Sequence, residues 1–165
     1  MAKRDKFQKT NAMRELERAG VAFSYRTYED DGEEARGIGV AIAEQLGEDP
    51  DRGFKTLMTV APSGDHVVCC VPVAEELDFK AAAHAAGEKS LSMLPTKELV
   101  AVTGYVRGGC SPVGMRKRFP TVIDETCLLY DTIYISGGRR GLRLELAPQD
   151  LVDFTGAVVA DIVRG

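Results

Sequence analysis

Tryptophan is absent from this sequence, histidine occurs only twice, and no long apolar run interrupts its 165 residues. No stretch approaches the roughly 20 consecutive apolar residues that cross a bilayer, so we expect no membrane partner. The basic N-terminus leads into a polar helix signal rather than into the apolar core of a secretory signal. We therefore expect a cytoplasmic protein.

Motifs for metals, nucleotide cofactors and common hydrolase mechanisms are also missing. The four cysteines contain no CxxC pair, and a closed zinc site needs such spaced ligands. No Walker loop, GxGxxG, HExxH or GxSxG motif occurs. His66 lies in a strand-like run and His84 in an Ala-rich helix, so a Ser-His-Asp or Cys-His mechanism has weak support. We expect no metal and no cofactor.

The cysteines differ in their sequence surroundings. Cys69 and Cys70 stand in the apolar run HVVCCVPV, which predicts small buried side chains rather than reactive thiols. Cys110 lies in a Gly-rich loop near Arg107, and a neighbouring cation lowers the pKa of a thiol. For Cys110, a structural role and a functional role are both open.

Charge is distributed unevenly along the chain, whose formal net charge is −4. Residues 103–143 carry seven lysines and arginines against three acids, whereas the remainder carries fourteen against twenty-two. The acidic total argues against indiscriminate nucleic-acid binding, and we expect no DNA partner. The basic segment fits either a local anionic ligand or a solvated charged face.

Hydrophobic periodicity predicts one domain over residues 1–165, with residues 1–8 as a flexible tail and the residues after 154 as a short apolar tail. We expect helices at residues 10–20, 38–46, 78–86, 95–102 and 148–154, and strands at 21–29, 54–60, 67–73, 121–123, 132–135 and 142–146. The turn sequence APSGD joins the second and third strands into a hairpin. Hairpins outnumber possible βαβ crossovers, which predicts a mixed α/β fold with a curved, mostly antiparallel sheet flanked by helices.

Two glycine pairs, Gly108–Gly109 and Gly137–Gly138, each follow a predicted strand or helix and have a serine and arginines nearby. Glycine lets backbone N–H groups approach an anion closely, as in phosphate sites and oxyanion holes. One such pair is more often a simple turn, but the repetition favours a ligand. A single lysine, Lys55, stands in the apolar strand FKTLMTV, where it either extends to solvent or faces a pocket.

Five groups of residues carry a resemblance to a known family. They are FKTL at 54–57, PV at 72–73 with LDFK at 77–80, GYVRGGCSPVG at 104–114, KRFPTVID at 117–124 and IYISGGRRGLRLEL at 133–146. In this order they resemble the YbaK family of free-standing aminoacyl-tRNA deacylases, which is similar to the editing domain of bacterial prolyl-tRNA synthetase. The resemblance implies a compact domain on a partly open, barrel-like sheet, and a hydrolase that removes cysteine mischarged onto tRNA(Pro).

The resemblance also implies roles for residues at matching positions. The catalytic set would be Lys55, Gly108 and Gly109, with the lysine near the terminal adenosine or ester and the glycine amides on the carbonyl oxygen. The substrate pocket would contain Tyr28, Ser111, Pro112, Ser136 and Gly137. The tRNA phosphates would meet Arg116, Lys117, Arg118, Arg139 and Arg140. The implied partners are the acceptor end of an aminoacylated tRNA and prolyl-tRNA synthetase.

The mechanism implied by the resemblance needs no nucleophile from the protein. The cysteinyl thiol of the substrate attacks its own ester carbonyl, which forms a cyclic thiolactone and releases the tRNA. One position departs from the family pattern, because the residue after RGL is often acidic and is Arg143 here. Another small amino acid, such as alanine, is therefore an alternative substrate. A non-catalytic module that binds tRNA or an aminoacyl-nucleotide, and a small-molecule phosphate binder, are alternatives of other classes.

Overall fold

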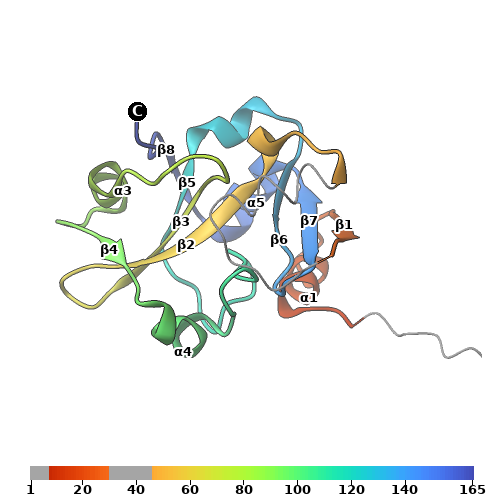
Figure 1. Ribbon diagram of the computed structural model, residues 1–165, viewed down its shortest axis with the longest axis horizontal. Helices are drawn as coiled ribbons and strands as arrows, with labels where there is room; N and C mark the ends of the chain where they lie inside the picture. The colour runs from red at the N-terminus through yellow and green to blue at the C-terminus, as the bar shows by residue number, and fades with distance from the viewer. Residues whose placement is uncertain (1–7, 30–45) are drawn as a thin grey trace, which may run out of the picture.

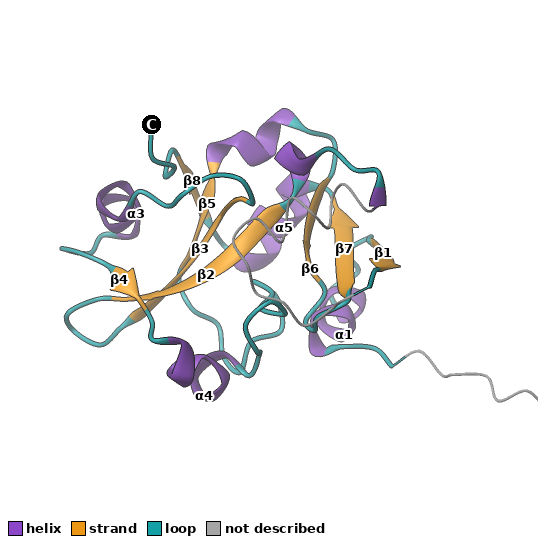
Figure 2. Cartoon of the chain, viewed as in Figure 1, coloured by secondary structure: helices purple, strands orange, loops and turns teal. Residues whose placement is uncertain are grey.

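The computed structural model describes residues 8–29 and 46–165, and its helices lie on the outside of two β-sheets (Figure 1, Figure 2). One sheet has the strand order β1-β7-β6 and the other has the order β4-β2-β3-β5-β8. The strands are β1 (Ser24–Thr27), β2 (Phe54–Val60), β3 (His66–Pro72), β4 (Ser92–Met93), β5 (Thr121–Asp124), β6 (Ile133–Ser136), β7 (Leu142–Leu146) and β8 (Val158–Ala160). The helices are α1 (Asn11–Arg18), α3 (Phe79–Ala86), α4 (Leu99–Thr103) and α5 (Pro148–Thr155), with 3-10 turns η1 (Pro50–Arg52), η2 (Thr96–Glu98) and η3 (Glu125–Leu129).

The expected mixed α/β single-domain fold is confirmed, and the expected curved sheet is divided into two. The sheets meet at an isolated bridge between Gly53, just before β2, and Tyr134 in β6. Within the described residues they do not close into a barrel. Four of the six strand pairs are antiparallel, and β5 makes the two parallel pairs, with β3 and with β8. The mostly antiparallel arrangement is therefore confirmed.

Local signals in the sequence explain where the helices begin and end. The Thr10 side chain accepts a hydrogen bond from the Met13 amide at 3.2 Å, which satisfies an unpaired donor at the start of α1. Asp78 does the same for α3, with the Ala81 amide at 3.0 Å. Helix α3 ends at Gly87, whose φ of 75° is a left-handed conformation that favours glycine. No described helix is long and apolar enough to cross a membrane.

Some sequence predictions differ from the structure or fall outside it. The helix predicted at 95–102 is the 3-10 turn η2 followed by the short helix α4. The apolar tail after residue 154 includes β8, a three-residue strand too short to show a strand period in the sequence. The helix predicted at 38–46 and the flexible tail at 1–8 lie almost wholly outside the described residues.

Side chains of β2 alternate between two hydrophobic cores, as a strand with a period of two requires. Phe54 and Met58 lie in a core between the two sheets that also contains Ile135 and Leu144. Leu57 points to the opposite face of its sheet and packs on a smaller core that includes Ala83 of α3. Both faces of β2 are therefore covered.

Candidate functional site

The two Gly-rich stretches meet in space, although about thirty residues separate them in the sequence. A Cβ atom on Gly108 would lie 3.4 Å from the Arg140 guanidinium, and one on Gly109 would lie 2.9 Å from the Arg139 Cα. The loop after α4 therefore packs directly against the turn between β6 and β7. The two Gly-rich stretches therefore lie side by side in the fold, which the repeated pattern of glycine, serine and arginine does not by itself predict.

Glycine is required at two of these positions for different reasons. Gly108 has a φ of +86°, which side-chain-bearing residues rarely adopt. Gly109 has an ordinary φ, but a Cβ atom there would lie closer to the Arg139 backbone than real Cβ contacts allow. Glycine at 109 thus permits the close approach of two backbones.

Hydrogen bonds fix the conformation of the loop that contains Ser111 and Pro112, both of which are buried. The Tyr105 hydroxyl donates to the Val113 carbonyl at 2.6 Å, and the Val113 amide donates to the Ser111 hydroxyl at 3.3 Å. These bonds hold the loop in one shape before any ligand binds.

The facing turn is fixed in the same way. The Thr10 hydroxyl at the start of α1 donates to the Gly137 carbonyl at 2.5 Å, and the Gly138 amide donates to the Ser136 hydroxyl at 3.2 Å. Residues from three separate elements therefore meet at this turn.

The backbone amides of the glycines are not equally available to a ligand. The Gly109 amide donates to the Val106 carbonyl, and the Gly137 amide donates to the Leu142 carbonyl, each at 2.9 Å. The Gly108 amide makes no backbone hydrogen bond among the described residues. The Gly108 amide is therefore available for an acceptor, whereas the Gly109 amide already has one, and the binding of an oxyanion by this pair stays a prediction.

Lys55 lies on the sheet face that carries the polar side chains of β6 and β7. It is half-buried in β2, two residues after Gly53, so residues 53 and 55 share one face. Gly53 pairs with Tyr134, and Ser136 of the same strand pairs with Arg143. Lys55 and Ser136 thus belong to one face, and Ser136 links this face to the turn that contains Gly137.

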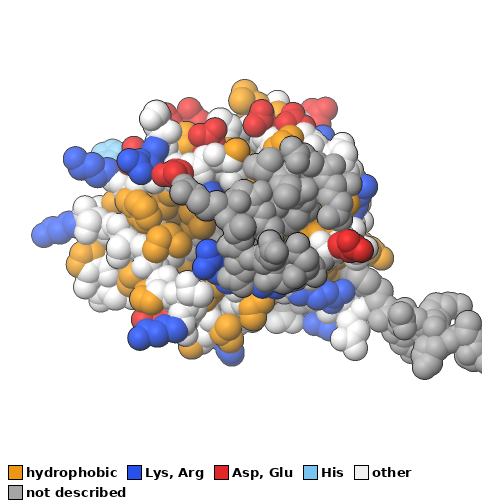
Figure 3. All heavy atoms as spheres, in the orientation of Figure 1, with side chains coloured by type: hydrophobic (Ala, Val, Ile, Leu, Met, Phe, Trp, Pro, Cys, Tyr) orange, Lys and Arg blue, Asp and Glu red, His pale blue; other side chains and the backbone are white. Residues whose placement is uncertain are grey.

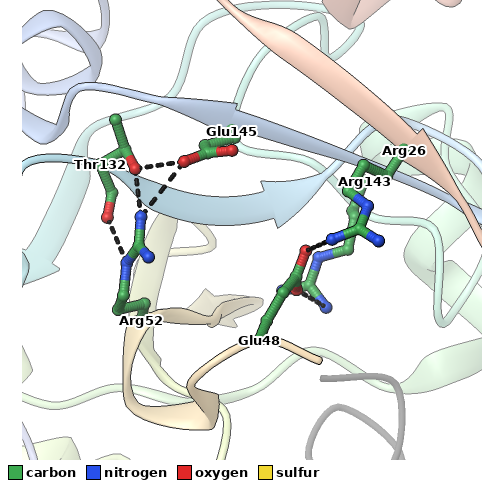
Figure 4. A network of polar contacts seen from close by, with 6 residues as sticks. All are labelled: Arg26, Glu48, Arg52, Thr132, Arg143 and Glu145. Atoms are coloured by element: carbon green, nitrogen blue, oxygen red, sulfur yellow. Dashed lines mark hydrogen bonds and ion pairs between the residues drawn. The ribbon is translucent and has the colours of Figure 1, made fainter. Parts of the chain in front are cut away.

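A buried ionic network occupies that face (Figure 4). The Glu48 carboxylate accepts a hydrogen bond from Arg26 at 3.3 Å through Oε2 and forms an ion pair with Arg143 at 3.1 Å through Oε1, which has no hydrogen-bond partner among the described residues. The Arg143 guanidinium also lies 4.8 Å from the centre of the Tyr134 ring. The side chains of Glu48 and Arg143 are only 2% and 8% exposed, whereas Arg26 is 48% exposed.

A second ionic group lies beside this network. Arg52 bonds to the Glu145 carboxylate at 3.2 Å and to the Thr132 carbonyl at 3.0 Å, and it also donates to the Thr132 hydroxyl. The Thr132 hydroxyl donates to Glu145 at 2.5 Å. The segment before β2 is thereby attached to β6 and β7, as Figure 4 shows.

Burial perturbs both partners of the inner ion pair. Desolvation raises the pKa of Glu48 above its usual range, and the charges of Arg143 and Arg26 oppose that shift. Desolvation lowers the pKa of Arg143, and the charges of Glu48 and Tyr28 oppose that shift. The Arg143 Nε is buried and has no hydrogen-bond partner among the described residues. The predicted pocket residue Tyr28 is therefore close enough to influence this pair electrostatically.

Sequence reasoning singled out Arg143 as a departure from the family pattern but missed Glu48. Glu48 follows Gly47 and precedes Asp49, a context typical of an exposed turn. Only its tertiary contacts with Arg143 and Arg26 distinguish it from other surface acids.

The cationic run Arg116–Arg118 has structural contacts of its own. Arg116 Nε donates to the carbonyl of Val100, the second residue of the short helix α4, at 3.3 Å. Arg118 donates to the Phe154 carbonyl at 2.7 Å near the end of α5, and it lies 4.5 Å from the Phe154 ring centre. Cations at a helix C-terminus stabilise the helix through its dipole. All three residues of the run are nevertheless exposed, so their predicted contacts with phosphate stay predictions.

A cavity of about 140 Å³ lies beneath this cationic run, between α1, β3, the loop 112–121 and the end of α5. It reaches the predicted substrate pocket through Pro112 and does not include Lys55 or Gly108. On the face shown in Figure 3, acidic side chains gather along the upper edge, above η1 and η3, while lysines and arginines lie elsewhere. The described residues hold no cluster of three His, Cys, Asp or Glu side chains placed to bind a metal.

All four cysteines are buried and unbonded to one another. Burial raises the pKa of Cys110 to about 12 and the pKa values of Cys69 and Cys127 to about 11. Burial also raises the pKa of Cys70. A thiol in such a site is protonated at neutral pH and is a weak nucleophile. The structural role is therefore favoured for Cys110 as well as for the other three.

Known proteins resemble this chain in sequence and in fold. A protein of Enterococcus faecalis named "Putative Cys-tRNA(Pro)/Cys-tRNA(Cys) deacylase EbsC" is 44% identical over 162 residues, which cover 98% of each chain. The crystal structure of the hypothetical protein APE2540 has a TM-score of 0.82 at 27% identity and covers 94% of this chain and 100% of its own.

A second solved structure is described as "a putative trans-editing enzyme for prolyl tRNA synthetase". It has a TM-score of 0.78 at 25% identity and covers 96% of this chain and all of its own. The sequence profile of the aminoacyl-tRNA editing domain matches residues 33–154. The chain therefore belongs to the aminoacyl-tRNA editing domain family.

Proposed function

We propose that this chain is a trans-editing deacylase that releases mischarged cysteine from tRNA(Pro). The observation that carries the proposal is the 44% identity, over nearly the whole chain, to a relative whose name gives that activity. The packing of the loop at Gly108–Gly109 against Arg139 and Arg140 supports it, because the resemblance assigns the two glycines to the aminoacyl end and the two arginines to the tRNA phosphates.

The proposed reaction uses the thiol of the substrate. Its sulfur forms a bond to the ester carbonyl carbon, the bond from that carbon to the ribose oxygen breaks, and the thiol proton passes to the released ribose oxygen. The product is a cyclic thiolactone, which water then opens to free cysteine. Because both reacting groups belong to one molecule, the protein accelerates the step by holding them together.

The side chains of the protein position and polarise the ester in this scheme. The Gly108 amide and the Lys55 ammonium group stabilise the negative charge that develops on the carbonyl oxygen. The Ser136 hydroxyl accepts a backbone hydrogen bond and keeps its own O–H for the substrate, whereas the fully buried Ser111 shapes the pocket through its bond to the Val113 amide. The buried, protonated state of the four protein thiols supports a reaction in which none of them takes part.

The proposal extends to partners and location. The acceptor end of aminoacylated tRNA is the substrate, and prolyl-tRNA synthetase is the source from which the mischarged tRNA comes. Protein synthesis places such an enzyme in the cytoplasm. Tyr28, Pro112 and Gly137 complete the aminoacyl pocket, while the two basic segments at Arg116–Arg118 and Arg139–Arg140 contact the tRNA phosphates.

A panel of aminoacylated tRNAs tests the activity. The purified protein is incubated with Cys-tRNA(Pro), Ala-tRNA(Pro), Ser-tRNA and correctly charged Pro-tRNA(Pro), and loss of each ester is followed over time. We expect rapid loss of cysteine alone. Faster loss of alanine would make alanine the substrate. Binding without turnover would identify a binding module, and neither binding nor turnover would leave a phosphate binder.

A further inference from the structure

We propose that the cavity beneath Arg116–Arg118 binds one unpaired cytidine of the tRNA acceptor end, with the base inside the cavity and its phosphate on the cationic rim. This inference rests on the proposed function, because it concerns how the same substrate is held beyond its terminal adenosine. Every tRNA carries two unpaired cytidines immediately before that adenosine. The cavity combines a partly open hollow with a cationic rim.

The walls of the cavity suit a flat ring. Met115, Phe119 and Phe154 line it, and the two phenylalanines also pack against the main core, which fixes their positions. Its volume of about 140 Å³ is many times the roughly 10–15 Å³ that one water needs by the same measure. Proteins commonly bind unpaired bases by stacking them on aromatic side chains and on arginine guanidinium groups.

One acidic side chain gives the cavity a preference among bases. Glu15 of α1 is half-buried and lines the cavity beside the cationic run. A carboxylate accepts a hydrogen bond from the exocyclic amine of cytosine. Uracil presents a carbonyl oxygen at the same position, which a carboxylate repels. The cavity therefore fits cytosine better than uracil.

The rim is held in place by the rest of the fold. Arg118 is fixed by the Phe154 carbonyl at 2.7 Å, and Arg116 by the Val100 carbonyl at 3.3 Å. Each guanidinium group has five N–H donors, so several are left for phosphate oxygens. A side chain that is already ordered loses less conformational entropy when a ligand binds.

The cavity is close enough to the glycine loop to hold the same RNA strand. Pro112 lines the cavity and follows Gly108, whose amide is the proposed oxyanion donor, by four residues. Four residues of extended chain span at most roughly 14 Å. One or two nucleotides therefore connect an ester at the glycine loop with a base in the cavity.

The test measures base preference in binding. An RNA minihelix carries cysteine through a non-hydrolysable amide at its 3′ end, and its terminal CCA is compared with versions in which either cytidine is uridine. Fluorescence anisotropy gives the affinities. We expect wild-type protein to bind the CCA minihelix about tenfold more tightly than one of the two uridine versions.

Variants assign that preference to the cavity. Glu15→Gln is expected to reduce the preference to below about twofold, because an amide both donates and accepts hydrogen bonds. Glu17→Gln is the matched control, since Glu17 lies on the same helix, is exposed and is paired with Lys9 at 3.0 Å. This control retains the full preference. Phe119→Leu keeps an apolar wall but weakens stacking, and it lowers the affinity for all minihelices about tenfold.

Two results would overturn the inference. One is equal affinity of wild-type protein for all three minihelices, and the other is an unchanged preference in a folded Glu15→Gln protein. Hydrolysis of the short ester cysteinyl-adenosine separates this inference from the proposed function. If that ester is cleaved while the base preference is missing, the cavity proposal alone fails. If the wild-type protein does not cleave the ester, the proposed function fails.

Discussion

Lys55 is the residue whose replacement bears most directly on the proposed chemistry. It is half-buried in β2, on the sheet face that also carries Ser136. If its ammonium group stabilises the developing oxyanion, Lys55→Ala lowers kcat/KM for Cys-tRNA(Pro) by about a hundredfold or more. Single-turnover kinetics with enzyme in excess over the tRNA, at concentrations below saturation, measures the loss of kcat/KM.

The control for this prediction is Lys80→Ala, which removes an exposed lysine from α3 and leaves kcat/KM unchanged. The thermal unfolding midpoint of Lys55→Ala should stay close to that of the wild type. Wild-type turnover in the Lys55→Ala protein would show that this lysine only extends to solvent.

The source of the reacting thiol can be read from the dependence of the rate on pH. The substrate thiol titrates near the ordinary cysteine value of about 8.5, so the rate of a substrate-assisted reaction rises with pH and levels above that value. Burial raises the pKa of Cys110 to about 12, so attack by its thiolate would give a rate that still rises far above pH 9. After subtraction of the rate without enzyme, we expect the rate to level off at high pH, as substrate-assisted cleavage requires.

Replacement of Cys110 tests the same point independently. Cys110→Ala removes a buried side chain from the main core and costs some stability, but turnover in the folded protein should persist. Loss of all turnover in a folded Cys110→Ala protein, or a covalent cysteinyl adduct on the enzyme detected by mass spectrometry, would return this thiol to the role of nucleophile.

The Arg143–Glu48 pair is predicted to depend strongly on both partners. Among the described residues, Arg143→Met leaves the buried Glu48 carboxylate paired with the half-exposed Arg26, and it should lower the free energy of unfolding by about 3–5 kcal/mol. The double variant Arg143→Met, Glu48→Met removes both buried charges and should recover most of that loss. Urea denaturation of the four proteins in this cycle measures the coupling.

The pH dependence of stability gives a second measure of the pair. Because the folded-state pKa of Glu48 is raised, its contribution to stability is greatest below its ordinary value and is lost as the pH rises through the folded value. Glu48→Gln should remove that loss from the curve of unfolding free energy against pH. In the urea experiment, the changes in unfolding free energy of Arg143→Met and Glu48→Met are compared with that of the double variant. If the two changes add up to the change of the double variant, the two side chains do not interact.

At the scale of the elements, local signals in the sequence predict much of the fold. The hairpin of β2 and β3 follows from two β-rich runs around APSGD, and α1 and α3 begin at residues that cap them, Thr10 and Asp78. Strand β8 could not be predicted, because its three residues become a strand by parallel pairing with β5. Pairing partners far apart in the sequence leave no local periodicity.

In the candidate site, too, the residues set by local backbone conformation could be predicted from the sequence, and those set by distant contacts could not. Its glycine loops could be recognised because unusual backbone conformations restrict residue type, as at Gly108 with its φ of +86°. Glu48 could not be recognised, since its role depends on contacts with two distant strands. The sequence also could not show which glycine amides are free to bind a ligand. The hydrogen bond from the Gly109 amide to the Val106 carbonyl depends on the three-dimensional course of the loop.

At the scale of the whole molecule, the net negative charge of the protein opposes the binding of its negatively charged RNA substrate. The net charge of −4 disfavours approach of a polyanion at long range, whereas residues 103–143 provide a local excess of cations. These cations also have structural contacts, as those of Arg116 and Arg118 show. Binding to RNA should therefore be local, and its strength should depend on a small number of phosphate contacts.

The salt dependence of binding tests that conclusion. Each phosphate contact contributes about 0.7 to 0.9 to the slope of log K against log salt concentration. If Arg116, Lys117 and Arg118 each contact a phosphate, changing all three to glutamine should reduce the slope by about two and weaken binding to tRNA at low salt.

Changing Lys80, Lys89 and Lys97, which are all exposed, to glutamine is the matched control. It alters the net charge equally and should leave the slope unchanged, because these lysines lie outside the basic segment. Since Arg116 and Arg118 also bond to carbonyls near the ends of α4 and α5, thermal unfolding of the triple variant has to show a folded protein at the assay temperature. An unaltered slope in that folded variant would place the RNA path elsewhere, at Arg139 and Arg140.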